Sequence, residues 1–272
     1  MNQNFVKYSA LGNDYIVIDP NTSNISIDHD AIIKICDRHN GPGSDGILYG
    51  PESKDHLSLK IFNPDGSECD KSGNGLIIFA HYLYDNGCVG HTNFDIHLKD
   101  ESVSIQPIDP DNGLFKVRMG KGKPAQLDDR KQPYPYLGYA TTFADTTLVG
   151  SFISIGNPHI VLETDAPTVE LAQSLGPIVS NHPMFQNRTN VQFCKILSRH
   201  EIQIEIYERG AGYTLASGSS SCAAVTALYL QGKVDAKVKV NMPGGVLDIE
   251  IDAELQTHLI GSSKIIYSGE LT

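Results

Sequence analysis

Apolar and polar residues alternate in short runs along most of the chain, and glycine, asparagine, aspartate or proline separates one run from the next. An alternation with a period of two is typical of a strand with one buried face, so these runs predict β-strands. The expected strands lie at 16–18, 57–61, 103–105, 115–118, 152–155, 202–206 and 238–240. A few longer segments predict helices, at 29–37, 74–86, 167–175 and 219–231.

Several short motifs recur 144 or 145 residues apart. In one matched pair both copies open a predicted helix, in another both copies follow a predicted strand, and in a third a glycine lies where each helix should stop. The matched pairs are Gly12-Asn13 with Gly156-Asn157, 62–66 with 207–211, Ser72-Gly73 with Ser217-Gly218, and Gly87 with Gly232. Landmarks in nearly constant register predict a duplicated chain with two similar lobes. The segments 107–113 and 119–136, rich in proline, glycine and aspartate, predict the linker.

The composition is typical of a packed globular protein, with 40% hydrophobic and 19% charged residues. A formal net charge of −11, without a local Lys or Arg cluster, argues against nucleic acid as a partner. No signal peptide and no apolar run of roughly 20 residues is evident, so we expect a cytoplasmic protein that binds no membrane. The five cysteines are scattered without a zinc spacing, which predicts reduced thiols and no metal site.

Each repeat contains a Ser-Gly pair where a helix is predicted to begin, Ser72-Gly73 and Ser217-Gly218. The unpaired N–H groups and partial positive charge of a helix N-terminus bind carboxylate or phosphate, and glycine lets a ligand approach the backbone. Two such termini facing one another would hold one carboxylate from both sides. The alternative is that both serines are simple N-caps. The constant spacing of the two pairs favours the ligand-binding interpretation.

Other polar candidates lie at the ends of predicted strands. Glu208-Arg209 directly follows an alternating strand, where a surface ion pair is the alternative, and His159 could equally be structural. Four asparagines adjoin turns, a position that asparagine also takes for conformational reasons alone: Asn13, Asn63, Asn157 and Asn190. No glycine-rich phosphate loop and no setting for a Schiff-base lysine is evident, so we expect no cofactor.

Nine motifs that span nearly the whole chain resemble the diaminopimelate epimerase family, and they run in that family's order. They are 11–15, 36–39, 43–46, 63–68, 72–75, 156–159, 188–191, 208–212 and 242–245. The resemblance implies an α/β fold with two pseudo-symmetric lobes, each a curled mixed or antiparallel sheet around a central helix. It also implies that the last strand returns to the first lobe. The expected lobes are therefore 1–120 with 263–272, and 121–262.

The resemblance further implies an isomerase that needs no cofactor and inverts one α-carbon of an amino diacid, converting L,L- to meso-diaminopimelate for lysine and peptidoglycan. Members of the family often form homodimers. Their two catalytic groups would correspond to Ser72, assisted by His159, and Ser217, assisted by Glu208. The distal end of the substrate would be held by Asn13, Asn63, Asn157, Asn190 and Arg209. The α-carboxylate would be held by the backbone N–H groups of Gly73, Asn74, Gly218 and Ser219.

The chain departs from the family at the two most important positions, because the family's catalytic cysteines correspond to Ser72 and Ser217. A serine hydroxyl is much less acidic than a thiol and needs an adjacent base. Further departures at Ile77 and at 219–220 favour a naturally divergent member over laboratory replacement of both cysteines. Three functions remain open at this point: a slow epimerase, a lyase or isomerase acting on a related amino acid, and a non-catalytic protein that binds such a ligand.

Overall fold

The computed structural model describes residues 3–125 and 136–271, and the chain divides into two compact units. Unit 1 comprises Met1–Arg118 with Ile260–Thr272, and unit 2 comprises Met119–Leu259. The chain therefore leaves unit 1 once and returns to it at the end. Part of the predicted linker, 126–135, lies outside the described residues.

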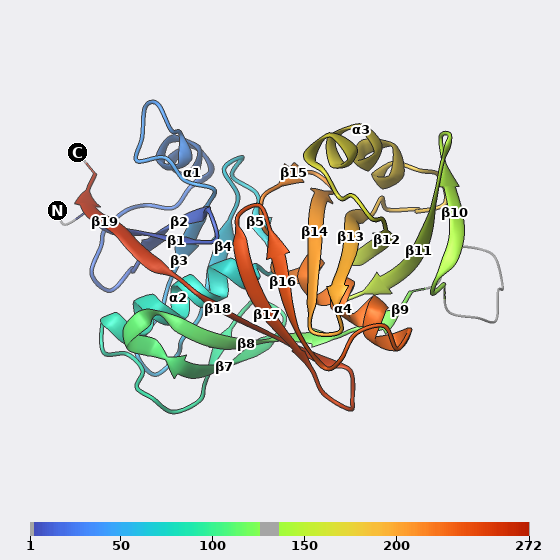
Figure 1. Cartoon of the computed structure of the whole chain (residues 1–272). Helices are drawn as coiled ribbons and strands as arrows, with labels where there is room; N and C mark the ends of the chain where they lie inside the picture. The colour runs from blue at the N-terminus through green and yellow to red at the C-terminus, as the bar shows by residue number, and fades with distance from the viewer. Residues whose placement is uncertain (1–2, 126–135, 272) are drawn as a thin grey trace. The chain divides into compact units, whose positions relative to one another are not determined.

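Unit 1 contains a six-stranded sheet in the order β19-β1-β2-β3-β4-β5, and a second group of antiparallel strands, β6, β7 and β8. Figure 1 shows β19, the last strand of the chain, beside β1, the first. The strands are β1 Asn4–Ala10, β2 Asn13–Ile18, β3 Ile47–Tyr49, β4 Lys60–Phe62, β5 Glu68–Cys69, β6 Phe94–His97, β7 Ser102–Asp109, β8 Leu114–Lys121 and β19 Lys264–Glu270. The helices are α1 His29–Cys36 and α2 Gly73–Asp85, with a 3-10 turn at Pro110–Asn112.

Unit 2 is built on one long mixed sheet, in which β10, β11, β12, β13, β14, β16, β17 and β18 follow one another. The strands are β9 Lys123–Pro124, β10 Tyr139–Phe143, β11 Thr146–Ser154, β12 Pro158–Glu163, β13 Asn190–Ser198, β14 Glu201–Glu208, β15 Gly212–Thr214, β16 Lys237–Met242, β17 Gly245–Ile251 and β18 Gln256–Ser262. The helices are α3 Val169–Ser180 and α4 Gly218–Leu230.

The two units repeat one topology. In unit 1 an antiparallel pair, β1 and β2, is followed by α1, a parallel strand β3, two antiparallel strands and α2. In unit 2, β11 and β12 are followed by α3, the parallel strand β13, β14, β15 and α4. Even the register repeats, since Ile16 pairs with Ile47 and Ile160 with Val191, both shifted by 144. The duplicated α/β fold predicted from the sequence is confirmed.

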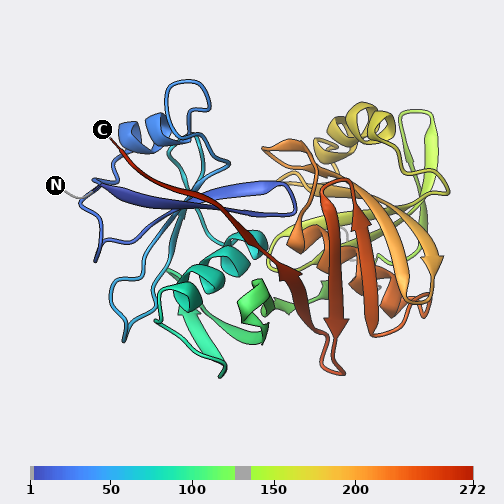
Figure 2. The same ribbon diagram turned by 60° about the vertical axis from the view of Figure 1, so that its left-hand side comes forward.

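Helix α2 is the centre of unit 1, because every residue from Gly73 to Leu83 is buried. It packs on β1 and β2, and Figures 1 and 2 show β7 and β8 on its other side. There His81 contacts the ring of Phe115 and lies 3.0 Å from the hydroxyl of Ser263. Burial on all sides explains why α2 is apolar around its whole circumference rather than along one stripe.

Helix α4 occupies the equivalent place in unit 2, with Gly218 and every residue from Ser220 to Leu228 buried. It packs on β11, β12, β13 and β17, whereas α3 packs on β13 and β14. Alternate residues of β13 separate the two helices: Val191 and Phe193 join the α3 core, and Gln192 reaches Ser220 of α4. Because side chains alternate across a strand, α3 and α4 cover opposite faces of the sheet.

The structure differs from the sequence-based expectation in two segments. Residues 107–113 are the end of β7 and the turn that leads into β8, not a linker between lobes. Helix α3 extends to Ser180, past Gly176-Pro177, where a stop was expected. Gly176 is required there because a Cβ atom would lie 2.6 Å from Tyr207, and the carbonyl that Pro177 leaves unbonded belongs to the exposed Gln173.

A buried ion cluster links β1, β2 and the segment after α1. The Asp14 carboxylate lies 2.7 Å from Lys7 Nζ and 2.6 Å from Arg38, and both Lys7 and Asp14 are buried. Burial alone would raise the pKa of Asp14, but hydrogen bonds from Arg38 and Lys7 outweigh it and hold that pKa well below its ordinary value. This contribution to stability is therefore present at neutral pH and is lost as the pH falls.

Asp14→Asn is expected to lower the free energy of unfolding by about 3–5 kcal/mol, because it leaves the Lys7 ammonium buried without its counter-charge. Urea denaturation followed by circular dichroism measures the change. Asp30→Asn is the matched control in the same unit, since the Asp30 side chain is fully exposed; it should cost less than about 1 kcal/mol. Equal losses in the two variants would contradict the prediction.

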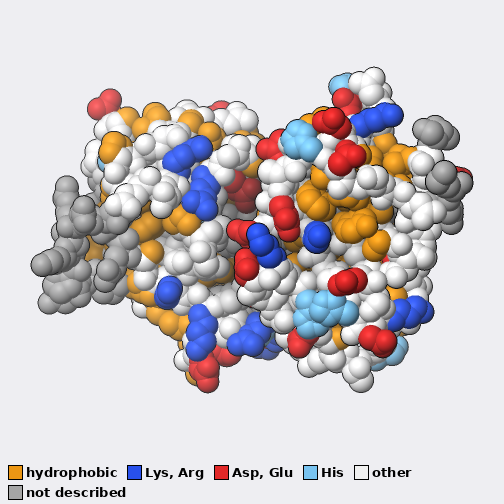
Figure 3. Space-filling view, turned by 180° about the vertical axis from the view of Figure 1, so that it is seen from behind, with side chains coloured by type: hydrophobic (Ala, Val, Ile, Leu, Met, Phe, Trp, Pro, Cys, Tyr) orange, Lys and Arg blue, Asp and Glu red, His pale blue; other side chains and the backbone are white. Residues whose placement is uncertain are grey.

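On the described surface visible in Figure 3, Lys and Arg side chains are interspersed with Asp and Glu and form no continuous basic area. The described helices include none long and apolar enough to cross a membrane.

Candidate active site

The N-terminus of α2 carries the first predicted catalytic group, Ser72. This residue has extended backbone angles and caps the helix, because its Oγ accepts a hydrogen bond from the Gly75 N–H at 3.1 Å. The hydroxyl of Tyr15, on β2, donates a second hydrogen bond to the same oxygen at 3.1 Å. Ser72 is half-buried and Gly73 buried. The serine is thus an N-cap, and its oxygen is also held from the sheet.

The asparagines of unit 1 differ in their surroundings. Asn74 is buried, and its amide donates weakly to Asn13 Oδ1 at 3.5 Å, while Asn13 donates to Asp45 at 3.0 Å. The side-chain oxygen of Asn74 accepts no hydrogen bond among the described residues. Asn63 instead stabilises its own turn, donating from its side chain to Ser67 Oγ at 3.0 Å. Unit 1 therefore brings Asn13 and Asn74 together, whereas the described side-chain hydrogen bond of Asn63 stays within its own turn.

The N-terminus of α4 carries the second predicted group, Ser217. It is buried, and its Oγ accepts from the Ser220 N–H at 3.4 Å and lies 3.5 Å from Ser219 Oγ. Both contacts are longer than those of Ser72. Gly218 is buried and Ser219 half-buried, so the first N–H groups of this helix are only partly covered.

Glu208 ends strand β14 beside this helix N-terminus. Burial raises the pKa of its carboxyl, and hydrogen bonding from the hydroxyls of Ser217 and Thr214 lowers it in part. Thr214 Oγ1 lies 3.5 Å from Oε2 of Glu208. A carboxylate whose pKa is raised toward neutrality, next to a hydroxyl, has the properties of a general base.

His159, at the start of β12, is fully buried. Its Nε2 lies 2.9 Å from Asn157 Oδ1, and its Nδ1 lies 3.1 Å from the amide nitrogen of Gln192, which also donates to Ser220 at 3.0 Å. These partners fit a neutral imidazole that donates from Nε2 and accepts at Nδ1. Burial lowers the pKa of His159 to about 3. The residue is therefore uncharged at neutral pH.

The remaining predicted residues of unit 2 form a connected group. Asn190 is buried, donates to the Pro158 carbonyl at 3.1 Å and accepts from the Arg209 backbone N–H at 3.0 Å. The guanidinium of Arg209 is exposed and donates to the Asn187 carbonyl at 3.0 Å. A guanidinium with donors to spare beside such amides suits a carboxylate ligand. The expected pairing of His159 with Ser72 stays a prediction.

The sequence of the chain matches the family model "Diaminopimelate epimerase" over residues 5–125 and 151–266. It is 44% identical to "Diaminopimelate epimerase 2" of Nostoc sp., over 98% of this chain and 95% of that protein. It is 33% identical to "Diaminopimelate epimerase" of Moorella thermoacetica, over 98% of both. The chain belongs to the diaminopimelate epimerase family.

Solved structures with the same fold are much more distant in sequence. A phenazine biosynthesis protein of the PhzF family from Bacillus anthracis superposes with a TM-score of 0.70 at 16% identity, covering 100% of this chain and 99% of that one. A probable proline racemase from Agrobacterium radiobacter K84 gives 0.69 at 14%, covering 99% and 92%. A hydroxyproline epimerase from Agrobacterium vitis gives 0.66 at 12%, covering 98% and 90%. These three structures share the fold of this chain.

Two residues that contact predicted site residues were not singled out from the sequence: Tyr15, which contacts Ser72, and Gln192, which contacts His159. Tyr15 could have been found from the repeat, because Gly12-Asn13 and Gly156-Asn157 are each followed two residues later by a polar ring, Tyr15 and His159. Gln192 carries no motif of its own. Only the pairing of β12 with β13 places it beside His159.

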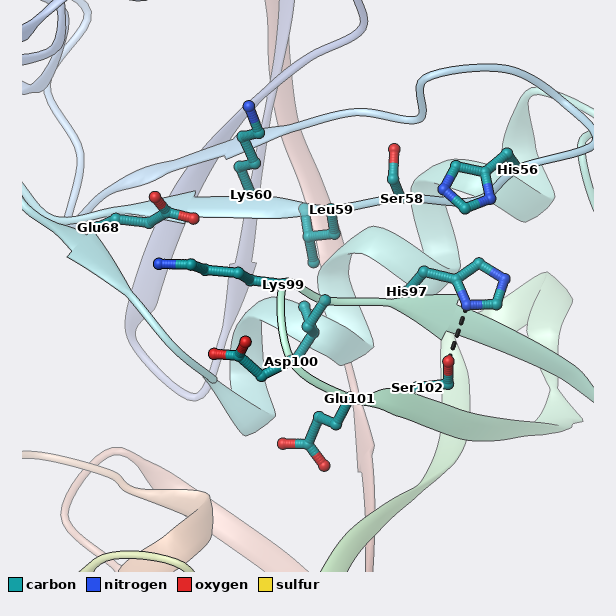
Figure 4. A pocket seen from close by; sticks show the side chains of 11 residues that line it. His56, Ser58, Leu59, Lys60, Glu68, His97, Lys99, Asp100, Glu101 and Ser102 are labelled. Carbon is teal, nitrogen blue, oxygen red and sulfur yellow. Dashed lines mark hydrogen bonds between the residues drawn. The ribbon is translucent and has the colours of Figure 1, made fainter.

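A separate groove on unit 1 has a volume of about 720 Å³ and is lined largely by polar side chains, from His56, 58–60, Glu68 and 97–102. Figure 4 shows the rings of His56 and His97 stacked there, with centroids 4.9 Å apart, and His97 within 2.8 Å of Ser102. None of the predicted site residues lines it. The groove is therefore separate from the predicted site residues.

None of the five cysteines occupies the N-cap position of α2 or α4, where Ser72 and Ser217 lie. The described residues form no disulfide, and Cys36, Cys194 and Cys222 are buried. Cys222, in the second turn of α4, is fully enclosed, and Cys69 points its sulfur toward the Lys71 carbonyl at 3.5 Å. The described residues contain no group of three or more His, Cys, Asp or Glu that could hold a metal. Ser72 and Ser217 cap the two central helices, and their catalytic role stays a prediction.

Proposed function

We propose that this protein is an amino-acid epimerase of diaminopimelate type, which inverts one α-carbon of the L,L diacid to give the meso form. The observation that carries the proposal is the pairing of Ser217 with the half-buried Glu208 carboxyl at the N-terminus of α4, in a chain 44% identical to a protein named diaminopimelate epimerase. A hydroxyl next to a base is the arrangement that lets serine act in catalysis.

The backbone N–H groups of Gly73, Asn74, Gly218 and Ser219 would hold the α-carboxylate, which carries the negative charge that a helix N-terminus favours. The unpaired side-chain oxygen of Asn74 would accept a hydrogen bond from the α-ammonium. The exposed Arg209 guanidinium would hold the distal carboxylate, together with Asn157 and Asn190. Asn13 and Asn63 are proposed on the family resemblance alone.

In the proposed reaction the α-proton passes to Ser217 Oγ while the Ser217 proton passes to the Glu208 carboxylate. The electron pair stays on the α-carbon, and charge that spreads onto the α-carboxylate is stabilised by the helix termini. Ser72 then gives its proton to the opposite face of the carbon. Because a serine hydroxyl is a weak acid and a weak base, we expect turnover to be slow compared with a thiol pair.

The test is exchange of the α-proton of L,L-diaminopimelate with deuterated water, followed by NMR and mass spectrometry at high protein concentration. We expect slow deuterium incorporation together with formation of the meso isomer. Calorimetric binding of the diacid without exchange would overturn the proposal in favour of a ligand-binding protein. Dehydration or elimination products from related amino acids would favour a lyase.

The compartment and the assembly of the protein stay predictions. A cytoplasmic location is supported by five cysteines that form no disulfide among the described residues, because thiols persist in a reducing compartment. A homodimer is supported by the family resemblance and by exposed apolar side chains on the edge strand β19, Ile265, Ile266 and Tyr267. An apolar edge strand is a surface that a second chain can cover.

A further inference from the structure

Tyr15 distinguishes the two helix N-termini. It lies on β2 at the position that His159 occupies on β12, since Ile16 and Ile160, the next residues, hold equivalent places in the two sheets. His159 reaches its helix through Gln192 and Ser220. Tyr15 instead reaches Ser72 directly, by its hydroxyl. The duplicated position therefore holds two different rings with two different connections.

The hydrogen bonds around Ser72 fix the role of its oxygen. A serine hydroxyl has one proton to donate and two lone pairs to accept with. The Tyr15 hydroxyl and the Gly75 N–H both donate to Ser72 Oγ, each at 3.1 Å. Both lone pairs are thus used, and neither partner takes the Ser72 proton. The hydroxyl is left with its proton available to a ligand.

The Ser217 hydroxyl donates a hydrogen bond within the protein, whereas the Ser72 hydroxyl accepts both of the hydrogen bonds described above. The Ser217 hydroxyl donates to the Glu208 carboxyl, and the N–H of Ser220 approaches the Ser217 oxygen only to 3.4 Å. Glu208 therefore offers the Ser217 proton an acceptor, whereas neither hydrogen bond that holds Ser72 among the described residues of unit 1 uses the Ser72 proton. One serine is arranged as part of a base and the other as an acid.

We propose that Tyr15 is a positioning residue that holds Ser72 as the proton donor of the reaction, so that the two serines are not interchangeable. This inference rests on the proposed epimerase function for its catalytic meaning, but the Tyr15–Ser72 bond can be tested without turnover. Abstraction of the α-proton belongs to Ser217 with Glu208, and delivery on the other face belongs to Ser72 with Tyr15.

The variant Tyr15→Phe removes only the hydroxyl. The ring is packed tightly, since a Cβ atom on Gly46 would lie 2.8 Å from Tyr15 Cε1, and it should keep its place. Tyr8→Phe is the matched control. Tyr8 is buried directly opposite Tyr15 in the sheet, and its hydroxyl donates to Asp85 at the far end of α2, at 2.9 Å.

The first experiment uses Ser72→Cys as a probe and measures how alkylation of the introduced thiol depends on pH, with peptide mass spectrometry to separate it from the five native thiols. A hydrogen bond from Tyr15 stabilises the thiolate. Adding Tyr15→Phe should therefore raise the thiol pKa by about one unit. Adding Tyr8→Phe should change it by less than about a third of that. Equal thiol pKa values in the two combinations would overturn the proposal, whether or not the protein is an epimerase.

The second experiment compares deuterium exchange with inversion in the protein that keeps Ser72. With Tyr15→Phe we expect inversion to fall about tenfold or more, while exchange that returns the starting isomer persists, and the substrate dissociation constant stays within about twofold. Parallel losses of exchange and inversion would overturn the donor role of Ser72. Absence of exchange in the unmodified protein would instead overturn the proposed function, and the thiol pKa would still decide the Tyr15–Ser72 bond.

Discussion

Replacing Ser72 and Ser217 together by cysteine is expected to raise the rate of epimerisation by about 10²–10⁴-fold. The reference pKa of a thiol, about 8.5, falls further at a helix N-terminus, so that a large fraction is thiolate near neutral pH. Both positions are such termini, because each serine caps its helix. Turnover of L,L-diaminopimelate to the meso isomer, followed by chromatography, measures the gain.

The single variants are the internal controls for the double replacement. Ser72→Cys and Ser217→Cys should each give less than the double variant, because inversion needs one group to remove a proton and another to return one. Ser72 is half-buried and can accept the larger sulfur more easily than the buried Ser217. A double variant no faster than its parent would show that these two positions do not act on the substrate.

Glu208→Gln is expected to lower the rate of α-proton exchange by about 10²–10⁴-fold, the usual contribution of a general base. The amide keeps the shape of the side chain but cannot take the proton of Ser217. Glu205→Gln is the matched control, since Glu205 lies on the same strand β14, is buried, and accepts from Tyr213 at 2.8 Å. A similar loss in both variants would point to damage to the strand rather than to a lost base.

The dependence of α-proton exchange on pH should also report the protonation state of Glu208. Burial raises the pKa of Glu208, so exchange should fall as the pH is lowered through that raised value, where the carboxylate takes up a proton. Burial lowers the pKa of His159 to about 3, so this histidine stays neutral and adds no step between pH 5 and 8. A limb near pH 6.5 that disappears in a His159 variant would contradict this assignment.

The repeat of about 145 residues was sufficient to predict the duplicated fold, because the matched motifs lie at equivalent turns and helix ends of the two units. Both central helices begin one residue before the predicted start, at Gly73 and Gly218. Helix α3 was predicted too short because Gly176-Pro177 reads as a stop, and only the Tyr207 ring packed on Gly176 explains its continuation. The sequence around Gly176 does not indicate this contact, because Tyr207 is distant along the chain.

The candidate site shows the same limit. The serines, His159 and Glu208 were found from motifs, and their assignment as site residues stays a prediction. Tyr15 lay within one of those motifs, but its role depends on a hydroxyl that meets Ser72, 57 residues later. Gln192 depends on the pairing of β12 with β13. Such partners are set by strand register, which the sequence pattern fixes only approximately.

The position of β19 has a consequence for synthesis of the chain on the ribosome. Unit 2 is continuous in sequence, so it can fold as soon as residue 259 has emerged. Unit 1 starts first but finishes last, because β1 pairs on one side with β2 and on the other with β19, at residues 264–270. At roughly 5–20 residues per second, the outer edge of β1 stays open for many seconds while unit 2 is made. During that interval the nascent chain exposes an unpaired strand, which is the kind of surface that chaperones bind.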